Sequence, residues 1–206
     1  MALGKRPAVA RETKGERTRK RIVEEALALV EEQGIAAVSQ ENVARRAGLS
    51  QSALRHHFPV KDDMLGAIFG EAFRSFYIVA ERELLKPECA PRDKLMQLIV
   101  NHLDYVLTSS DRIALEAFSF STRNATMLAD QSAWYHWLVA HYASLLGAIH
   151  PALDAGERNA RALAILSLCL GVWISAGKSR PLWPGQSRDE TRTALLGQIA
   201  RLIDGA

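Results

Sequence analysis

The stretch VSQENVARRAGLSQSALRHHF, residues 38–58, predicts two short helices that follow one another closely. Ser39 is a candidate N-cap, because its hydroxyl can accept a backbone N–H of the first helical turn. Val38 and Val43 flank that turn at the spacing of a hydrophobic staple. The same pattern of an apolar residue, a serine and a second apolar residue recurs eleven residues later as Leu49, Ser50 and Leu54. Two capped helices in succession are therefore expected.

The connection between these helices is predicted to turn sharply at Gly48, because glycine adopts backbone conformations that other residues avoid. Ala44 is small enough to let the second helix pack closely. Small Ala44, turning Gly48 and apolar Leu49 and Leu54 have the spacing of a helix-turn-helix. Each short helix is too brief to be stable alone, so both are expected to pack on a preceding helix at about residues 17–33.

The second short helix carries the candidate base-reading side chains. Leu54 and Phe58 are predicted to face inward, which leaves an outward set of Gln51, Ser52, Arg55 and His56. Glutamine can pair with adenine, arginine with guanine, and serine with several base edges or phosphates. The alternative is an ordinary helical hairpin in which the outward side chains are only solvated.

The charge distribution favours a polyanionic partner. The chain has a net charge of +3, but residues 1–22 hold eight basic and two acidic groups. Such a run can displace counterions from phosphates, and Arg17 and Lys20 are its candidate DNA contacts. The alternative is a solvated, disordered terminus.

The overall composition excludes several classes of protein. With 206 residues, 48% hydrophobic and 24% charged, the chain is expected to be globular. Its longest uncharged stretches are too short or too polar for a membrane helix, and no signal peptide is apparent. Cys89 and Cys169 lack the spacing of a disulfide framework or a metal site, and the histidines do not converge on an ion. No enzyme motif is present, so we expect no catalysis, metal or cofactor. The cysteine usage and the lack of membrane and signal segments lead us to expect a cytoplasmic protein.

Residues 38–65 as a whole resemble the DNA-binding signature of the tetracycline-repressor (TetR) family of bacterial regulators. The likeness extends over roughly residues 15–70. The positions that carry it are Ala44, Ala47, Gly48, Leu49, Ser50, Leu54, His57, Phe58, Pro59 and Lys61. Arg55 and His56 stand where the family usually has tyrosines, and Val60 stands where it favours a serine.

This resemblance implies an all-α homodimer. A basic arm (residues 1–14) would precede a three-helix helix-turn-helix DNA-binding domain (residues 15–61). Residues 62–206 would form a connector helix and a helical ligand-binding and dimerisation domain. Members are mostly repressors that a small molecule releases from DNA by changing the spacing of the two heads.

The C-terminal part is rich in aromatic residues, as an aromatic-lined and partly polar pocket would be. The alternative for each of them is a place in the core. The residues predicted to line a pocket are His102, Phe118, Met127, Trp134, Cys169 and Trp173. Residues 162–177 also resemble a helix of the family's choline-sensing repressors, but Leu170 replaces their acidic residue, so no choline site is predicted.

Two apolar stripes near the C-terminus predict an association surface. Paired DNA-reading heads need a two-fold dimer, and an interchain four-helix bundle would supply it. Internal core is the alternative for both stripes. The residues predicted at the interface are Leu163, Ser167, Leu170, Ile174, Leu195, Ile199 and Leu202.

These features lead to one expected function. The chain is predicted to be a homodimeric regulator, most simply a repressor that binds a palindromic operator in the major groove and is released by a partly apolar or aromatic inducer. Gln51, Ser52 and Arg55 would read bases. Phosphates would be anchored by Ser39, His56 and Lys61, together with the basic arm. The alternative is a helical carrier of small molecules or lipids that binds no specific DNA.

Overall fold

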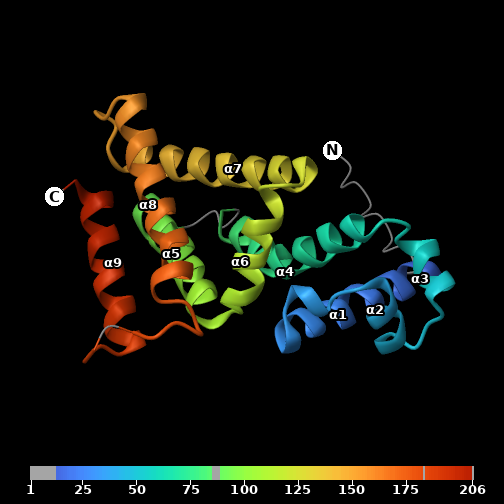
Figure 1. The fold of residues 1–206 in the computed structure, drawn as a ribbon. Helices are drawn as coiled ribbons and strands as arrows, with labels where there is room; N and C mark the ends of the chain where they lie inside the picture. The colour runs from blue at the N-terminus through green and yellow to red at the C-terminus, as the bar shows by residue number, and fades with distance from the viewer. Residues whose placement is uncertain (1–12, 85–88, 183, 206) are drawn as a thin grey trace, which may run out of the picture. The chain divides into compact units, whose positions relative to one another are not determined.

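The computed structural model describes residues 13–84, 89–182 and 184–205, and within them all regular secondary structure is helical (Figure 1). The all-α fold predicted from the sequence is confirmed. The chain divides into two compact units, which meet between Ile68 and Phe69 inside the long helix α4 (Lys61–Leu84). Most of the expected basic arm, residues 1–12, lies outside the described ranges.

The N-terminal unit is a three-helix group followed by the first turns of α4. Its elements are α1 (Lys14–Gln33), a short 3-10 helix η1 (Ile35–Ala37), α2 (Gln40–Arg46) and α3 (Gln51–His57). Helix α1 begins earlier than expected, because Thr13 and Glu16 form a reciprocal capping box. That T-x-x-E spacing is readable in the sequence.

Both predicted serine caps are present. The Ser39 hydroxyl accepts the N–H of Asn42 at 3.1 Å, and the Ser50 hydroxyl accepts the N–H of Ala53 at 3.1 Å. Each cap satisfies one of the backbone donors that a helix start leaves unpaired. The sequence therefore located the starts of α2 and α3 from local chemistry alone.

Two glycines shape the connections of this unit. Gly48 has φ +63° and closes α2, with its own N–H bonded to Arg45 O at 3.3 Å and the next N–H bonded to Ala44 O at 2.9 Å. This pair of bonds is a Schellman motif. Gly34 also has a positive φ, +84°, but its ψ of 171° is extended rather than left-handed, and the chain enters η1 from it.

The C-terminal unit contains the last part of α4 and five further helices. These are α5 (Pro91–Thr108), α6 (Asp111–Ser121), α7 (Ala125–Ile149), α8 (Ala155–Ser175) and α9 (Arg188–Asp204). Side-chain caps start four of them, and they come from Ser110, Asn124, Asp154 and Ser187.

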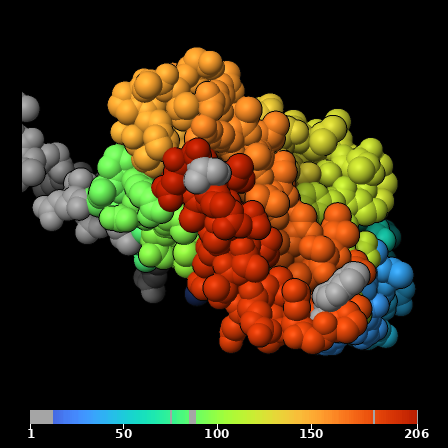
Figure 2. Space-filling view, turned by 90° about the vertical axis from the view of Figure 1, so that its left-hand side faces the viewer, coloured from blue at the N-terminus to red at the C-terminus, as the bar shows by residue number. Residues whose placement is uncertain are grey.

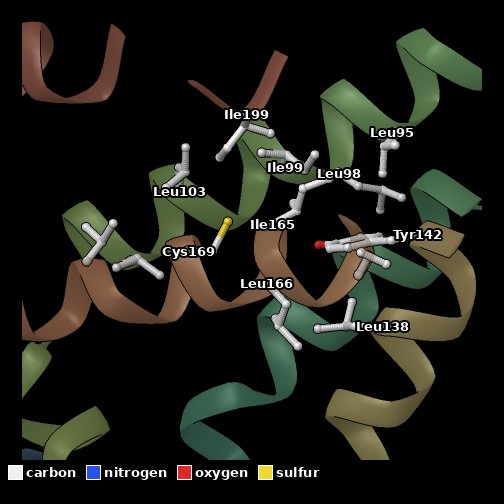
Figure 3. Packing of buried hydrophobic residues seen from close by; sticks show 14 of the residues in the cluster. Leu95, Leu98, Ile99, Leu103, Leu138, Tyr142, Ile165, Leu166, Cys169 and Ile199 are labelled. Atoms are coloured by element: carbon white, nitrogen blue, oxygen red, sulfur yellow. The ribbon is translucent and has the colours of Figure 1, made fainter. Parts of the chain in front are cut away.

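The core of this unit is built by α5, α7 and α8, which contact one another in pairs. Figure 3 shows aliphatic side chains of α5 and α8 around Tyr142 of α7, with the Tyr142 hydroxyl facing them. Cys169 of α8 points toward α5 and is fully buried. Dense apolar packing of this kind is what fixes the three helices against each other.

Helix α9 covers one side of this core. It contacts both α5 and α8, and Figure 2 shows it at the surface between them. Ile199 and Ile203 point inward and are fully buried. Two bidentate ion pairs hold the helix to α5, from Arg92 to Asp204 and from Arg192 to Asp104.

Candidate nucleic-acid interface and ligand site

Helix α3 presents a polar face to solvent. Leu54 inside the helix and Phe58 at its C-cap are fully buried, and the predicted outward residues Gln51, Ser52, Arg55 and His56 are all exposed. The Ser52 hydroxyl lies 3.0 Å from that of the cap residue Ser50. A rigid seven-residue helix with exposed amide, hydroxyl and guanidinium groups is suited to reading base edges in a groove.

The C-terminal end of α3 is held by two side chains from other helices. Gln40, at the start of α2, donates from Nε2 to Phe58 O at 2.7 Å. Arg19 of α1 donates from Nη1 to His57 O at 3.0 Å, and its guanidinium lies 3.9 Å from the centroid of the Phe58 ring. Carbonyls at a helix C-terminus carry partial negative charge, so a cation there is stabilising.

Arg19 is a positioning residue that sequence reasoning missed. It belongs to the basic run that includes Arg17 and Lys20, and its position in the sequence did not distinguish its role from theirs. Arg17 is exposed on α1, and Lys20 lies 3.9 Å from Glu24 with both side chains largely exposed. Only the packing of α1 against α3 selects Arg19 for a structural role.

The remaining DNA candidates lie at helix starts. Ser39 is half-buried and its oxygen caps α2, which leaves its O–H free to donate. Lys61 is exposed as the first residue of α4. A cation at a helix start, beside unpaired backbone N–H groups, is a suitable anchor for a phosphate.

Arg46 fixes α2 to α1. Its guanidinium binds Glu32 at 2.6 Å and Glu25 at 3.1 Å, both on α1. These hydrogen bonds, with Glu32 first, raise the pKa of Arg46 above its ordinary value. Arg45, the preceding residue, is exposed and bonds Asn42 of its own helix at 2.9 Å, so the two adjacent arginines face different surroundings.

The C-terminal unit contains a group of ring side chains, here called the aromatic cluster. Its members come from α4, α5, α7 and α8 and are Phe76, Tyr77, His102, Tyr105, Trp134, Trp137, His141 and Trp173. Phe76 lies at its centre, with ring centroids 4.5 Å from His102, 5.3 Å from Tyr105 and 5.9 Å from Trp134. The structure thus joins rings from four helices that are distant in sequence.

Three of the six predicted pocket residues belong to the aromatic cluster, namely His102, Trp134 and Trp173. Phe118 and Met127 lie on other parts of the unit, half-buried and buried respectively, and make none of the cluster's ring contacts. Cys169 is fully buried in the aliphatic core, where burial raises the pKa of its thiol to about 12. A thiol so enclosed lines no open pocket.

Five members of the cluster were not predicted, and Phe76 and Tyr77 are the most consequential. They lie on α4, which the sequence indicated only as a connector. Tyr105, Trp137 and His141 complete the set. Tyr105 is fixed by donating its hydroxyl to Ala72 O at 2.7 Å. A search for aromatic residues on more than one helix face would have found them, but their convergence is a tertiary property.

The predicted association surface is partly exposed. On α8, Leu163 is 56% and Ile174 is 67% exposed, and Ser167 between them is also exposed. Leu170 is half-buried, as are Leu195 and Leu202 on α9. Ile199 differs from the expectation: it is 0% exposed because α9 turns it into the unit's own core.

A polar cavity of about 470 Å³ lies elsewhere in this unit. Its lining residues are Asp111, Arg112, Leu115, Glu116, Ser179 and Arg180. Asp111 is buried and accepts both the N–H and the hydroxyl of Ser179, which ties the start of α6 to the segment after α8. None of the predicted pocket residues lines this cavity.

The family is indicated by residues 22–68, which match the model described as "Bacterial regulatory proteins, tetR family". This span includes the two capped helices and the Gly48 turn. Over this span the chain has the sequence of a tetR-family DNA-binding domain. Its N-terminal unit is therefore a helix-turn-helix DNA-binding domain of a transcriptional regulator, as the resemblance in the sequence implied.

Similar proteins agree with this family. The HTH-type transcriptional regulator PksA of Bacillus subtilis is 26% identical over 150 residues, which are 70% of this chain and 62% of PksA. A transcriptional regulator from Rhodococcus sp. Rha1 has the same fold at a TM-score of 0.73, with 20% identity over 91% of this chain and 97% of its own. AibR, solved with isovaleryl coenzyme A and operator DNA, has a TM-score of 0.66 and 14% identity over 90% of this chain and 97% of its own.

Two further observations concern the described residues. None of their helices is both long and apolar enough to cross a lipid bilayer. No three of their histidine, cysteine, aspartate and glutamate side chains come together in a way that could hold a metal ion.

Proposed function

We propose that this tetR-family chain is a cytoplasmic, ligand-responsive repressor that binds a palindromic operator as a homodimer. The observation that carries the proposal is the exposed polar face of α3, held at its far end by Arg19 and Gln40. A recognition helix must be both presented and rigid, because side chains discriminate bases only from a fixed position.

Within this proposal the exposed residues divide into two roles. Gln51, Ser52 and Arg55 read base edges in the major groove. Ser39, His56 and Lys61 bind phosphates, with help from Arg17 and Lys20. Phosphate contacts fix the register of the protein on DNA and give affinity for any sequence, whereas base contacts give specificity.

Dimerisation is proposed through α8 and α9. The exposed stripe of Leu163, Ser167 and Ile174 would face its copy on the partner subunit, with Leu170, Leu195 and Leu202 beside it. A two-fold interface of this kind spaces two α3 helices for the two halves of a palindrome. Ile199 is left out, since its burial in the core gives it no surface to offer.

The inducer is proposed to bind at the aromatic cluster. The last part of α4 contributes Phe76 to this cluster, and the first turns of α4 belong to the N-terminal unit. A ligand that shifts α4 would thereby bias the DNA-binding unit through a continuous helix. AibR, which was solved with both a coenzyme A ester and operator DNA, supports this type of regulation by its fold.

The proposal is tested by gel-shift titration against DNA from upstream of the protein's own gene, at about 50 and about 200 mM salt. Arg55→Ala should relax preference at one base position by about 1–3 kcal/mol. Lys61→Ala should weaken binding to all sequences alike and reduce the salt slope by about 1. Lys178→Ala removes one positive charge from the C-terminal unit and should change neither the base preference nor the salt dependence of DNA binding.

The absence of any discrete complex would instead support a helical carrier without specific DNA binding. Wild-type behaviour of both Arg55→Ala and Lys61→Ala would refute the assignment of α3 as the recognition helix.

A further inference from the structure

His102 brings an unpartnered polar atom to the aromatic cluster. Its side chain is 4% exposed, and its Nδ1 is buried and makes no hydrogen bond with any residue that the structure describes. A buried nitrogen in this state loses its water without gaining a partner. Groups of this kind in native proteins are rare, and a bound molecule that reaches the nitrogen would supply the missing hydrogen bond.

The aromatic cluster contains two pairs of near-parallel rings, and Phe76 of one pair lies beside His102. Phe76 and Tyr105 are stacked at an interplanar angle of 23°, and Trp134 and Trp137 are stacked at 17°. Tyr77, Tyr105, Trp134 and Trp137 are only half-buried, so the cluster reaches solvent. Near-parallel rings favour another flat ring as a neighbour, since offset stacking is a preferred aromatic geometry.

The charge state of His102 also favours an uncharged ligand. Burial lowers the pKa of His102 to about 4, so its imidazole is neutral near pH 7. A neutral imidazole nitrogen either accepts from an O–H or N–H group or donates to an oxygen, depending on the tautomer. The Tyr105 hydroxyl is already engaged with Ala72 O at 2.7 Å, so it does not compete for His102.

A quaternary ammonium ion is the main competing ligand, because aromatic rings also bind cations through their faces. Asp130 lies close enough to Tyr77 to act on its hydroxyl electrostatically, which would suit a cation. Such an ion has no N–H to donate, however, and no lone pair to accept. A quaternary ammonium ion would therefore use the faces of the aromatic rings but would leave His102 Nδ1 without a hydrogen bond.

We propose that the aromatic cluster binds an uncharged, planar aromatic molecule that carries a hydroxyl group, and that this hydroxyl donates a hydrogen bond to His102 Nδ1, the unprotonated nitrogen of the neutral imidazole. The ring system of the ligand packs against Phe76 and Trp134. This inference rests on the proposed function, and it adds the chemical class of the inducer and the residue that selects it.

The test is isothermal titration calorimetry of the full chain without DNA, with three probes. 2-Naphthol has the ring system and the hydroxyl, 2-methoxynaphthalene has the same ring system without the O–H, and tetramethylammonium is the quaternary ammonium ion. We expect 2-naphthol to bind about tenfold more tightly than 2-methoxynaphthalene, because only the first can satisfy the buried nitrogen. Tetramethylammonium should bind more weakly than 2-naphthol.

Two variants isolate the hydrogen bond. His102→Phe should remove the preference for 2-naphthol and leave the affinity for 2-methoxynaphthalene nearly unchanged, while His102→Gln, which keeps a hydrogen-bonding group, should restore part of the preference. Tyr142→Phe is the matched control: the Tyr142 hydroxyl is also buried without a partner, but it lies in the aliphatic core, so its removal should not alter the preference.

The proposal is overturned if the two naphthalenes bind the wild type equally, if neither binds, or if tetramethylammonium binds more tightly than 2-naphthol. Should His102→Phe fail to fold, the wild-type comparison of the two naphthalenes still decides. Because the measurement contains no DNA, its failure is distinct from failure of the repressor proposal, which the gel-shift titration detects.

Discussion

The Arg19 guanidinium lies 3.9 Å from the ring centroid of Phe58 and donates a hydrogen bond to the carbonyl of His57. One side chain of α1 therefore covers the buried residue that ends α3 and also binds a carbonyl at the end of that helix. The orientation of the exposed face of α3 depends on this contact as well as on the apolar core beneath it.

Arg19→Ala should lower the free energy of unfolding by about 1 kcal/mol, from the lost cation–π contact and hydrogen bond. It should also weaken operator binding more than loss of one charge explains, because α3 loses an attachment. Urea unfolding and gel shifts measure the two effects. Arg21→Ala removes one exposed charge from the same helix and serves as the control. Equal effects of the two variants would show that the contact has no positioning role.

Gly48→Ala should destabilise the protein by about 1–2 kcal/mol, because a left-handed φ of +63° is strained for alanine. The added methyl group meets nothing within 4 Å, so the cost comes from the backbone alone. Gly66 has equally open space but lies inside α4. Gly66→Ala should instead stabilise by up to about 1 kcal/mol, since alanine favours a helix. Thermal unfolding of both variants checks that the two substitutions change the stability of the protein in opposite directions.

Leu163→Arg should convert the proposed homodimer into a monomer, because it places a positive charge from each copy on a self-complementary apolar surface. Leu128 of α7 is 49% exposed, against 56% for Leu163, and lies outside the proposed interface. Leu128→Arg should therefore leave the dimer intact. Sedimentation velocity distinguishes the two states, and a dimer that persists in Leu163→Arg at micromolar concentration would refute the proposed surface.

The protein should lose stability as the pH falls from 7 to 4, partly through His102. Burial lowers the folded-state pKa of His102 to about 4, below the value near 6.5 expected in the unfolded chain. Between these values the unfolded chain binds more protons, so the contribution is complete above about pH 6.5 and is lost on acidification, at roughly 3 kcal/mol.

Urea unfolding of the wild type and of His102→Phe at both pH values isolates this contribution. Carboxyl groups titrate alike in the two proteins, so the wild type should lose more stability on acidification than the variant does. Equal losses of stability in the two proteins would mean that folding does not lower the pKa of His102.

The parts that could be predicted from the sequence are those in which cause and effect lie within a few residues. The caps at Ser39 and Ser50 and the turn at Gly48 depend on side chains and backbone one to four positions apart, so their spacing identified the helix-turn-helix. Leu54 and Phe58 fixed which face of α3 is buried, and the outward set followed from the helical repeat.

The full membership of the aromatic cluster could not be predicted in this way. His102, Trp134 and Trp173 were anticipated, but Phe76 and Tyr77 were not, because nothing near them in the chain indicates that α4 approaches α5 and α7. Ile199 shows the same limit on a surface: an apolar stripe on a helix has the same period whether it faces the chain's own core or a partner.

The amino-acid sequence by itself determined the all-helical fold, the ends of α2 and α3 and the composition of the exposed face of α3, since these follow from capping, glycine conformation and helical periodicity. Only the tertiary structure decided that Arg19 braces α3, that His102 lies unpartnered beside Phe76, and that Ile199 is internal. These are contacts between segments distant in the chain, and they form because packing brings together whole helices, whose mutual positions no local pattern encodes.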